Sequence, residues 1–190
     1  MMTIKIKKRA IVGLMLLPMG LANASESDMS FKMLLGVKTL ESDWGKDDSM
    51  DTIGFQITYQ PTSIPVGVAL DLYGSGNEEK NKGVKTETTV GEVNLGFRWQ
   101  PKLLANSLAP YLGAGVSFAA AELQELNSGT KNTYEDNGTG FWVGGGVDYL
   151  FAKHWSIGID ARYSTVDVKL TGKTRDAGGV GWGATVGYHF

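Results

Sequence analysis

Apolar side chains recur at every second position in eight segments of the chain. This spacing is the period of a β-strand whose two faces meet different surroundings. The residues between the apolar ones are polar, charged or very small, so each segment has one apolar face and one polar face. In chain order the apolar faces are Phe31 to Val37, Ile53 to Tyr59, Val66 to Leu72, Val93 to Trp99, Leu112 to Phe118, Phe141 to Phe151, Trp155 to Tyr163 and Val180 to Phe190.

Such strands can form either a soluble periplasmic sandwich with apolar faces inside or a membrane barrel with apolar faces outside. Two features favour the barrel. The segments are about nine to twelve residues long, which is enough for a tilted strand to cross a bilayer. Aromatic residues also concentrate at the segment ends, as in the interfacial girdles of membrane barrels: Tyr59, Trp99, Tyr149, Phe151, Trp155, Tyr188 and Phe190.

The connections between the segments alternate in length. Residues 40–50, 74–87, 121–139 and 167–179 form long polar connections, whereas residues 60–64, 100–110 and 152–154 form shorter ones. Bacterial barrels have long extracellular loops, short periplasmic turns and an even number of strands. We therefore predict an all-β, eight-stranded antiparallel up-and-down transmembrane β-barrel in the Gram-negative outer membrane, with both termini in the periplasm.

The two ends of the chain carry export and assembly features. Four basic residues, an apolar run from Ala10 to Leu21 and the small residues Ala22-Asn23-Ala24 predict a signal peptide over residues 1–24 that is removed, leaving a barrel domain over residues 25–190. At the other end, Tyr188 and Phe190 resemble the C-terminal assembly signal of outer-membrane barrels. This resemblance implies the barrel-assembly machinery and periplasmic chaperones as partners.

Charge and composition narrow the function further. The whole chain has a net charge of −2, and removal of the four basic residues of the signal takes it near −6, which argues against nucleic acid as a partner. The chain has no cysteine, which excludes a disulfide framework and a thiolate metal site. We predict no cofactor and no metal.

The polar faces carry ionisable residues of both signs. Burial of unpaired charge is costly, so a balanced set predicts an internal salt-bridge network that fills the barrel. An eight-stranded barrel holds little more than its own side chains or one small ligand, which argues against a wide pore. The many glycines on this face leave two alternatives open: a narrow passage or small cavity beside the charge network, or relief of crowding where strands bend. The predicted network consists of Lys32, Lys38, Asp71, Glu92, Arg98, Asp148, Asp160 and Arg162.

Two other features invite a chemical interpretation. His154-Trp155-Ser156 resembles the His-x-Ser pair of outer-membrane lipid A deacylases, which implies a lipid A-modifying hydrolase as an alternative function. The pair follows a short turn, however, at the end opposite the outer leaflet, so we predict no catalytic residue, and His189 is expected to be a rim residue. The acidic segment from Glu41 to Asp48 could attract divalent cations at the lipopolysaccharide surface, but a solvated loop is the better interpretation.

The later strands contain sequence motifs that resemble those of a known family. Ala109-Pro110-Tyr111-Leu112-Gly113-Ala114-Gly115-Val116, Gly145-Gly146-Val147-Asp148-Tyr149 and the closing Gly187-Tyr188-His189-Phe190 resemble the OmpW-like and OmpA-like (OmpX-like) group of small outer-membrane barrels. The OmpW resemblance implies a narrow path for small hydrophobic solutes, and the OmpA resemblance implies a structural barrel. We expect a non-enzymatic, monomeric barrel in contact with outer-membrane lipids and lipopolysaccharide, acting as a structural or surface-interaction protein or as a narrow conduit.

Overall fold

The computed structural model describes residues 27–41, 48–81, 84–101, 107–127, 130–170 and 172–190, and its regular elements there are all strands. The predicted signal peptide and most of the acidic segment after Glu41 lie outside these residues. The all-β prediction is confirmed. The strands are β1 (Ser27–Leu40), β2 (Ser49–Pro61), β3 (Val66–Asn81), β4 (Val84–Trp99), β5 (Leu108–Asn127), β6 (Thr130–Phe151), β7 (Trp155–Thr165), β8 (Asp167–Leu170), β9 (Lys173–Asp176) and β10 (Gly179–His189).

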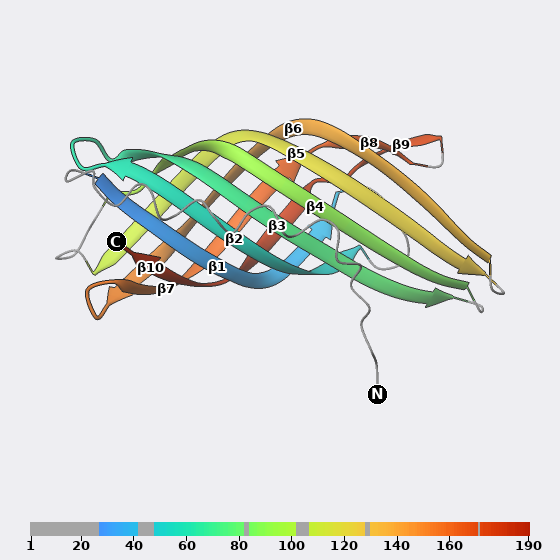
Figure 1. Ribbon diagram of the computed structural model, residues 1–190, viewed down its shortest axis with the longest axis horizontal. Coiled ribbons are helices and arrows are strands. Elements are labelled where there is room, and N and C mark those ends of the chain that lie inside the picture. The colour runs from blue at the N-terminus through green and yellow to red at the C-terminus, as the bar shows by residue number, and fades with distance from the viewer. Residues whose placement is uncertain (1–26, 42–47, 82–83, 102–106, 128–129, 171) are drawn as a thin grey trace.

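Eight of these strands close into one antiparallel barrel in the order β1-β10-β7-β6-β5-β4-β3-β2 (Figure 1). Hydrogen-bonded partners followed once around the ring from Tyr149 lead to Thr139 on the same strand, a displacement of ten residues. Strand number and displacement together fix the tilt and the narrow bore of a barrel. A single closed ring also excludes the two-layered soluble sandwich.

The two faces of the barrel wall are chemically opposite. Side chains that point inward are polar and buried, as at Gln56 and Asn94. Side chains that point outward are apolar and exposed, with 65% of Phe97 and 67% of Ile159 accessible. We call this ring of exposed apolar side chains the apolar belt; it suits a hydrocarbon surrounding and not water. Among the described residues there is no helix with the length and hydropathy needed to span a membrane.

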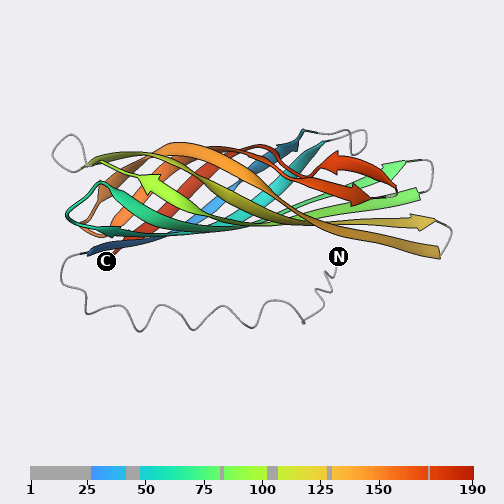
Figure 2. The same cartoon turned by 90° about the horizontal axis from the view of Figure 1, so that it is seen from above.

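The ends of the barrel differ. The end that contains Phe190, here called the near end, has short connections at residues 62–65 and 152–154. At the opposite far end, β3 to β6 continue beyond the other strands, as both Figure 1 and Figure 2 show. We call this extension the far-end sheet; it comprises residues 76–81, 84–89, 122–127 and 130–137.

The far-end sheet corrects the predicted loops. Residues 74–87 and 121–139 were expected to be irregular, but they pair as strands up to Asn81, Val84, Asn127 and Thr130. The alternation of apolar and polar residues fades there because this part of the sheet lies beyond the apolar belt. The backbone hydrogen bonds between the strands continue all the same. An apolar period therefore marks only the part of a strand that has one apolar surrounding.

The fourth predicted long connection, residues 167–179, also contains regular structure. Strands β8 and β9 form a separate two-stranded hairpin between β7 and β10. Its turn includes Gly172 with a φ of 77°, a conformation that favours glycine. The Lys169 backbone N–H donates to the Asp136 carboxylate of β6, so this hairpin lies against the far-end sheet.

Candidate functional site

The barrel lumen contains all eight residues of the predicted charge network. Each has at most 5% of its surface exposed. Three of the four cations form short ion pairs within the lumen: Lys32 Nζ with Asp148 Oδ2 at 3.0 Å, Lys38 Nζ with Glu92 Oε2 at 2.8 Å, and Arg98 Nη2 with Asp71 Oδ2 at 2.8 Å. The first two join strands that are not neighbours in the ring, whereas Arg98 and Asp71 lie on the adjacent strands β4 and β3.

Neutral side chains complete the hydrogen bonding of these pairs. Asp148 also accepts from Gln100 Nε2 at 3.1 Å, and Arg98 Nη1 donates to Thr58 Oγ1 at 2.7 Å. Ser164 Oγ donates to the second oxygen of Glu92 at 2.6 Å. Buried ion pairs are tolerated when such extra bonds satisfy their remaining atoms.

Arg162 is placed differently from the other three cations. Its Nη1 atom lies 4.0 Å from Asp160 Oδ1, which is beyond hydrogen-bonding distance. Its guanidinium instead stacks on the Tyr73 ring, 3.3 Å from the ring centroid. In the ring order β7 and β3 are opposite one another, so the Arg162 and Tyr73 side chains together span the lumen, and the guanidinium lies close to Gly181 of the adjacent strand β10.

Three large inward aromatics, Tyr73, Tyr111 and Trp142, were not assigned from the sequence. The Tyr111 hydroxyl donates to Asp160 Oδ2 at 2.5 Å, and Lys32 Nζ lies 3.8 Å from the Tyr111 ring centroid. Their spacing in the sequence could have revealed them. Each lies an even number of residues from a polar or glycine position on the inward face of its strand, which predicts that its side chain also points inward.

The inward glycines face these aromatic rings. A Cβ atom at Gly54 would lie 2.3 Å from the Tyr73 ring, and one at Gly113 would lie 2.8 Å from the Trp142 ring. At both positions the missing side chain makes room for a ring. Of the two alternatives left open by the sequence, relief of crowding fits these positions.

A cavity of about 160 Å³ lies at the near end of the lumen. Its wall includes the neutral polar residues Ser30, Thr58, Gln60 and Gln100. His189 and Phe190, at the end of the chain, also line it. Gln100 connects the cavity wall to the charge network through Asp148. The Lys32–Asp148 pair therefore lies one hydrogen bond away from the cavity wall.

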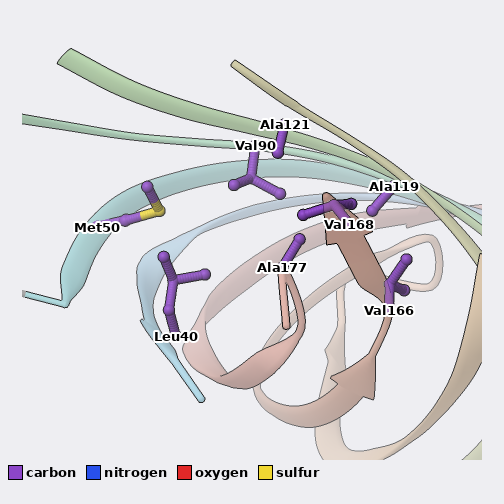
Figure 3. Close-up of a cluster of buried hydrophobic side chains, with 8 residues drawn as sticks. All are labelled: Leu40, Met50, Val90, Ala119, Ala121, Val166, Val168 and Ala177. Carbon is purple, nitrogen blue, oxygen red and sulfur yellow. The ribbon is translucent and has the colours of Figure 1, made fainter. Parts of the chain in front are cut away.

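The far mouth of the lumen is closed by apolar side chains. Val166, Val168 and Ala177, contributed by the β8–β9 hairpin and the residues on either side of it, have at most 1% of their surface exposed. Figure 3 shows Val168 and Ala177 within the group and close to Val90 of the barrel wall. We call this group the apolar plug; it consists of Leu40, Met50, Val90, Ala119, Ala121, Val166, Val168 and Ala177.

Polar contacts hold the hairpin over the mouth. Asp176 accepts hydrogen bonds from the backbone N–H groups of Val166 and Gly178, each at 2.7 Å. Lys38 Nζ donates to the Ala177 carbonyl at 2.7 Å, which joins the plug to the Lys38–Glu92 pair. Backbone N–H groups, first that of Lys169, hold the pKa of the Asp136 carboxyl below its usual value.

The structure does not form the His154–Ser156 pair of the alternative deacylase interpretation, in agreement with the prediction that this pair is not a catalytic site. His154 follows the tight turn at Ala152 and Lys153, and its Nδ1 donates to the His189 carbonyl at 2.7 Å. Ser156 is buried and hydrogen-bonds His189 Nε2 at 2.9 Å. The deacylase interpretation required His154 and Ser156 to lie on the same face of one strand. His154 instead belongs to the turn before β7, so the two side chains do not pair.

The geometry agrees with a family model. The model of the outer membrane protein beta-barrel domain matches residues 10–190. The chain belongs to this family. Membership of this family supports a location in the Gram-negative outer membrane. The predicted resemblance to small OmpA-like and OmpX-like barrels is confirmed.

Solved structures show the same fold at low identity. Neisserial surface protein A has a TM-score of 0.63 at 16% identity, covering 86% of this chain and 96% of its own. The attachment invasion locus protein Ail of Yersinia pestis has a TM-score of 0.58 at 18% identity, covering 87% and 99%. A major outer membrane protein from Thermus thermophilus has a TM-score of 0.63 at 10% identity, covering 86% and 99%. No curated protein matches the sequence.

Proposed function

We propose that this family member is a closed, non-conducting and non-enzymatic barrel that anchors a rigid sheet for contacts at the cell surface. One observation carries the proposal. The lumen is filled twice, by ion pairs in its middle and by the apolar plug at its far mouth. A barrel closed in two places is suited to hold the far-end sheet in position and is poorly suited to conduct solutes.

The proposed orientation places the near end in the periplasm and the far end outside the cell. The short near-end connections and the long far-end strands support it, since bacterial barrels have short periplasmic turns. In this orientation both ends of the barrel domain face the periplasm, and Tyr188 and Phe190 would be read there by the assembly machinery. The far-end sheet and the β8–β9 hairpin would meet lipopolysaccharide and external partners.

The charge of the far end favours a cationic partner. Acidic side chains outnumber basic ones there, and Glu78 already engages Lys85 at 2.7 Å, a hydrogen bond that lowers the pKa of Glu78. Ail has been crystallised with the heparin analogue sucrose octasulfate, a polyanion, which this acidic surface would repel. At the far end, the acidic residues in the described part of the chain are Glu41, Asp48, Asp51, Glu78, Glu79, Glu87, Glu122, Glu125, Glu135, Asp136, Asp167 and Asp176; the basic ones are Lys80, Lys85, Lys131, Lys169, Lys173 and Arg175.

The test is binding of charged probes to the protein in nanodiscs. A lysine-rich peptide should bind, and heparin should not. The affinity for the peptide should fall as salt rises from about 0.05 to about 0.5 M, because salt screens the attraction between exposed charges. Replacement of the outward Glu87, Glu122 and Glu135 by Gln should weaken peptide binding about tenfold. Asp28→Asn, the same type of change at the near end, is the control.

Two results would overturn this proposal. Binding of heparin in place of the peptide would contradict the charge argument, and equal loss of binding in Asp28→Asn would show that overall charge acts instead of the far end. Uptake of small hydrophobic solutes by liposomes containing the protein would favour the conduit over the closed barrel.

A further inference from the structure

The outer wall of the barrel has a groove where the apolar belt ends on β3, β4 and β5, which are neighbours in the ring (Figure 1). Its volume is about 650 Å³. The last large apolar side chains of the belt on these strands line one side of it; they are the cross-strand partners Leu72, Val93 and Phe118. The next outward positions toward the far end hold small residues, of which Gly91 and Ala120 also line the groove. The groove therefore follows a step in the wall from large to small side chains.

Neither packing nor backbone conformation requires the glycines at this step, Gly74 and its cross-strand partner Gly91. A Cβ atom built at either position has no other part of the protein within 4 Å, apart from its chain neighbours. Both residues lie outside the positive-φ region that favours glycine. The inward glycines differ, because a Cβ atom at Gly54 or Gly113 would meet an aromatic ring. Glycine weakens a strand and often marks the close approach of a ligand, so this groove has the features of a ligand site.

A second depression, of about 450 Å³, continues the groove toward the far end. The two meet on β4, where Thr89 of the second depression lies two residues from Gly91 of the first on the same face of the strand. The second depression is polar, and its wall includes the acidic residues Asp51, Glu78 and Glu87. An apolar groove that leads into an acidic one matches a molecule with a hydrocarbon tail and a polar head.

Charge decides which head fits. Lys80 and Lys85 engage Glu78, at 3.5 and 2.7 Å. The ion pairs of the described residues involve neither Asp51 nor Glu87, so these two carboxylates favour a cation. The phosphate groups of lipopolysaccharide carry the same sign as the carboxylates and would be repelled.

We propose that the two depressions together bind a cationic amphiphile, with its hydrocarbon tail over Gly91 and Ala120 and its ammonium group beside Asp51 and Glu87. Within a bilayer a tail gains from close packing and not from leaving water, so the groove sets the position of the tail and the carboxylates select the sign of the head. This site goes beyond the contacts proposed for the far-end sheet, because it takes a tail as well as a charge, and it is independent of which end of the barrel faces outward.

Photolabelling of the protein in nanodiscs tests the site. The probes are dodecylamine and dodecanoate, each with a diazirine in its tail, and mass spectrometry gives the share of the total label that falls on Val93 and Phe118. This share corrects for partition of the tails into lipid. The amine should give a share about fivefold higher than the acid, the effect of two exposed ion pairs. Equal shares for the two probes would overturn the proposal.

Gly91→Leu fills the groove, and its added Cβ meets open space. The excess share of the amine should disappear, whereas binding of a lysine-rich peptide, which has no tail, should not change. Ala184→Leu adds the same side chain at an exposed position of β10, opposite β4 in the ring, and should preserve the excess. Heat-modifiable gel mobility shows that both variants are folded; should Gly91→Leu lack it, Ala120→Leu fills the groove from β5. An excess that survives filling of the groove would contradict the proposal.

The head group is tested by Asp51→Asn combined with Glu87→Gln, which removes two charges at nearly constant shape. The share of the amine should fall to that of the acid, and Asp28→Asn at the near end should leave it as it is. An amine share unchanged by the double substitution would count against the acidic site. Efficient disulfide dimers of Val93→Cys in vesicles, in a chain with no other cysteine, would show that a second copy covers the groove and would overturn the choice of an amphiphile.

Discussion

The middle and the far mouth of the lumen are closed by opposite means. In the middle, charged side chains fixed on the strands of the ring pair across the bore, as Lys32 does with Asp148. At the mouth, a hairpin outside the ring contributes apolar side chains such as Val168 to a water-excluding group. The first closure is part of the barrel wall, whereas the second is attached to it.

This difference separates global from local stability. Removal of a charge from the middle leaves its partner buried and unpaired inside the ring, so the whole barrel should become less stable. Loss of the plug should release a hairpin that has only a two-stranded sheet of its own, and such local opening needs less free energy than global unfolding. The two regions should therefore respond differently to substitution.

Glu92→Ala should have the largest effect. It leaves Lys38 buried without its carboxylate, which costs about 3–5 kcal/mol in the free energy of unfolding. Urea-dependent unfolding in phospholipid vesicles measures this loss. Exposed Glu87 lies on the same strand, and Glu87→Ala should leave the unfolding free energy unchanged.

A double variant sharpens this prediction. Lys38→Met combined with Glu92→Leu removes both charges and should recover most of the stability, because a buried pair can be replaced by apolar residues at little cost. A double variant as unstable as Glu92→Ala alone would show that the loss comes from packing or from Ser164 and not from unpaired charge.

Val168→Asp should have an intermediate and local effect. The substitution takes a carboxylate out of water and into a group of apolar side chains, so the β8–β9 hairpin should leave the mouth while the ring stays closed. Hydrogen exchange should accelerate at residues 166–177 and remain slow in β1 and β2. Lys173→Asp, which introduces the same residue at an exposed position of β9, should leave exchange in both regions as it is.

Acid should produce the smallest effect, again at the hairpin. The Asp136 carboxylate accepts backbone N–H groups, and its pKa in the folded protein is lowered below the unfolded value of about 3.9. Its contribution to hairpin docking is therefore complete above about pH 4 and is lost as the pH falls through the folded pKa. Exchange at Lys169 should accelerate in this acidic range, and Asp136→Asn should abolish that step; an identical pH profile in the variant would contradict the assignment.

The contrast also explains what could be predicted from the sequence. The charged residues of the middle alternate strictly with apolar belt residues, so parity alone assigned Lys32 and Arg98 to the interior. The plug gave no such signal. Val166 and Val168 follow a period of two as well, but they lie within a polar segment that has no apolar belt outside it. Their burial depends on a cluster that includes Leu40 and Met50, more than a hundred residues away in the sequence.

The same reasoning applies to the strands and to the histidines. Glu122 and Glu135 are paired in a strand ladder although both faces of the far-end sheet are polar, so hydrophobic alternation could not reveal them. Ser156 was correctly placed on a strand, but its partner is His189, brought there by the closing of β10 against β7. Residues brought together by ring closure are not visible in local spacing.

Single-channel recording in planar bilayers tests the central claim that both closures block the lumen. Purified protein should add no stable conductance step in 1 M potassium chloride, and heat-modifiable gel mobility should show that the inserted barrel is folded. Reproducible ohmic steps from folded wild-type protein would contradict the closed barrel and would show that ions pass both the charge network and the apolar plug.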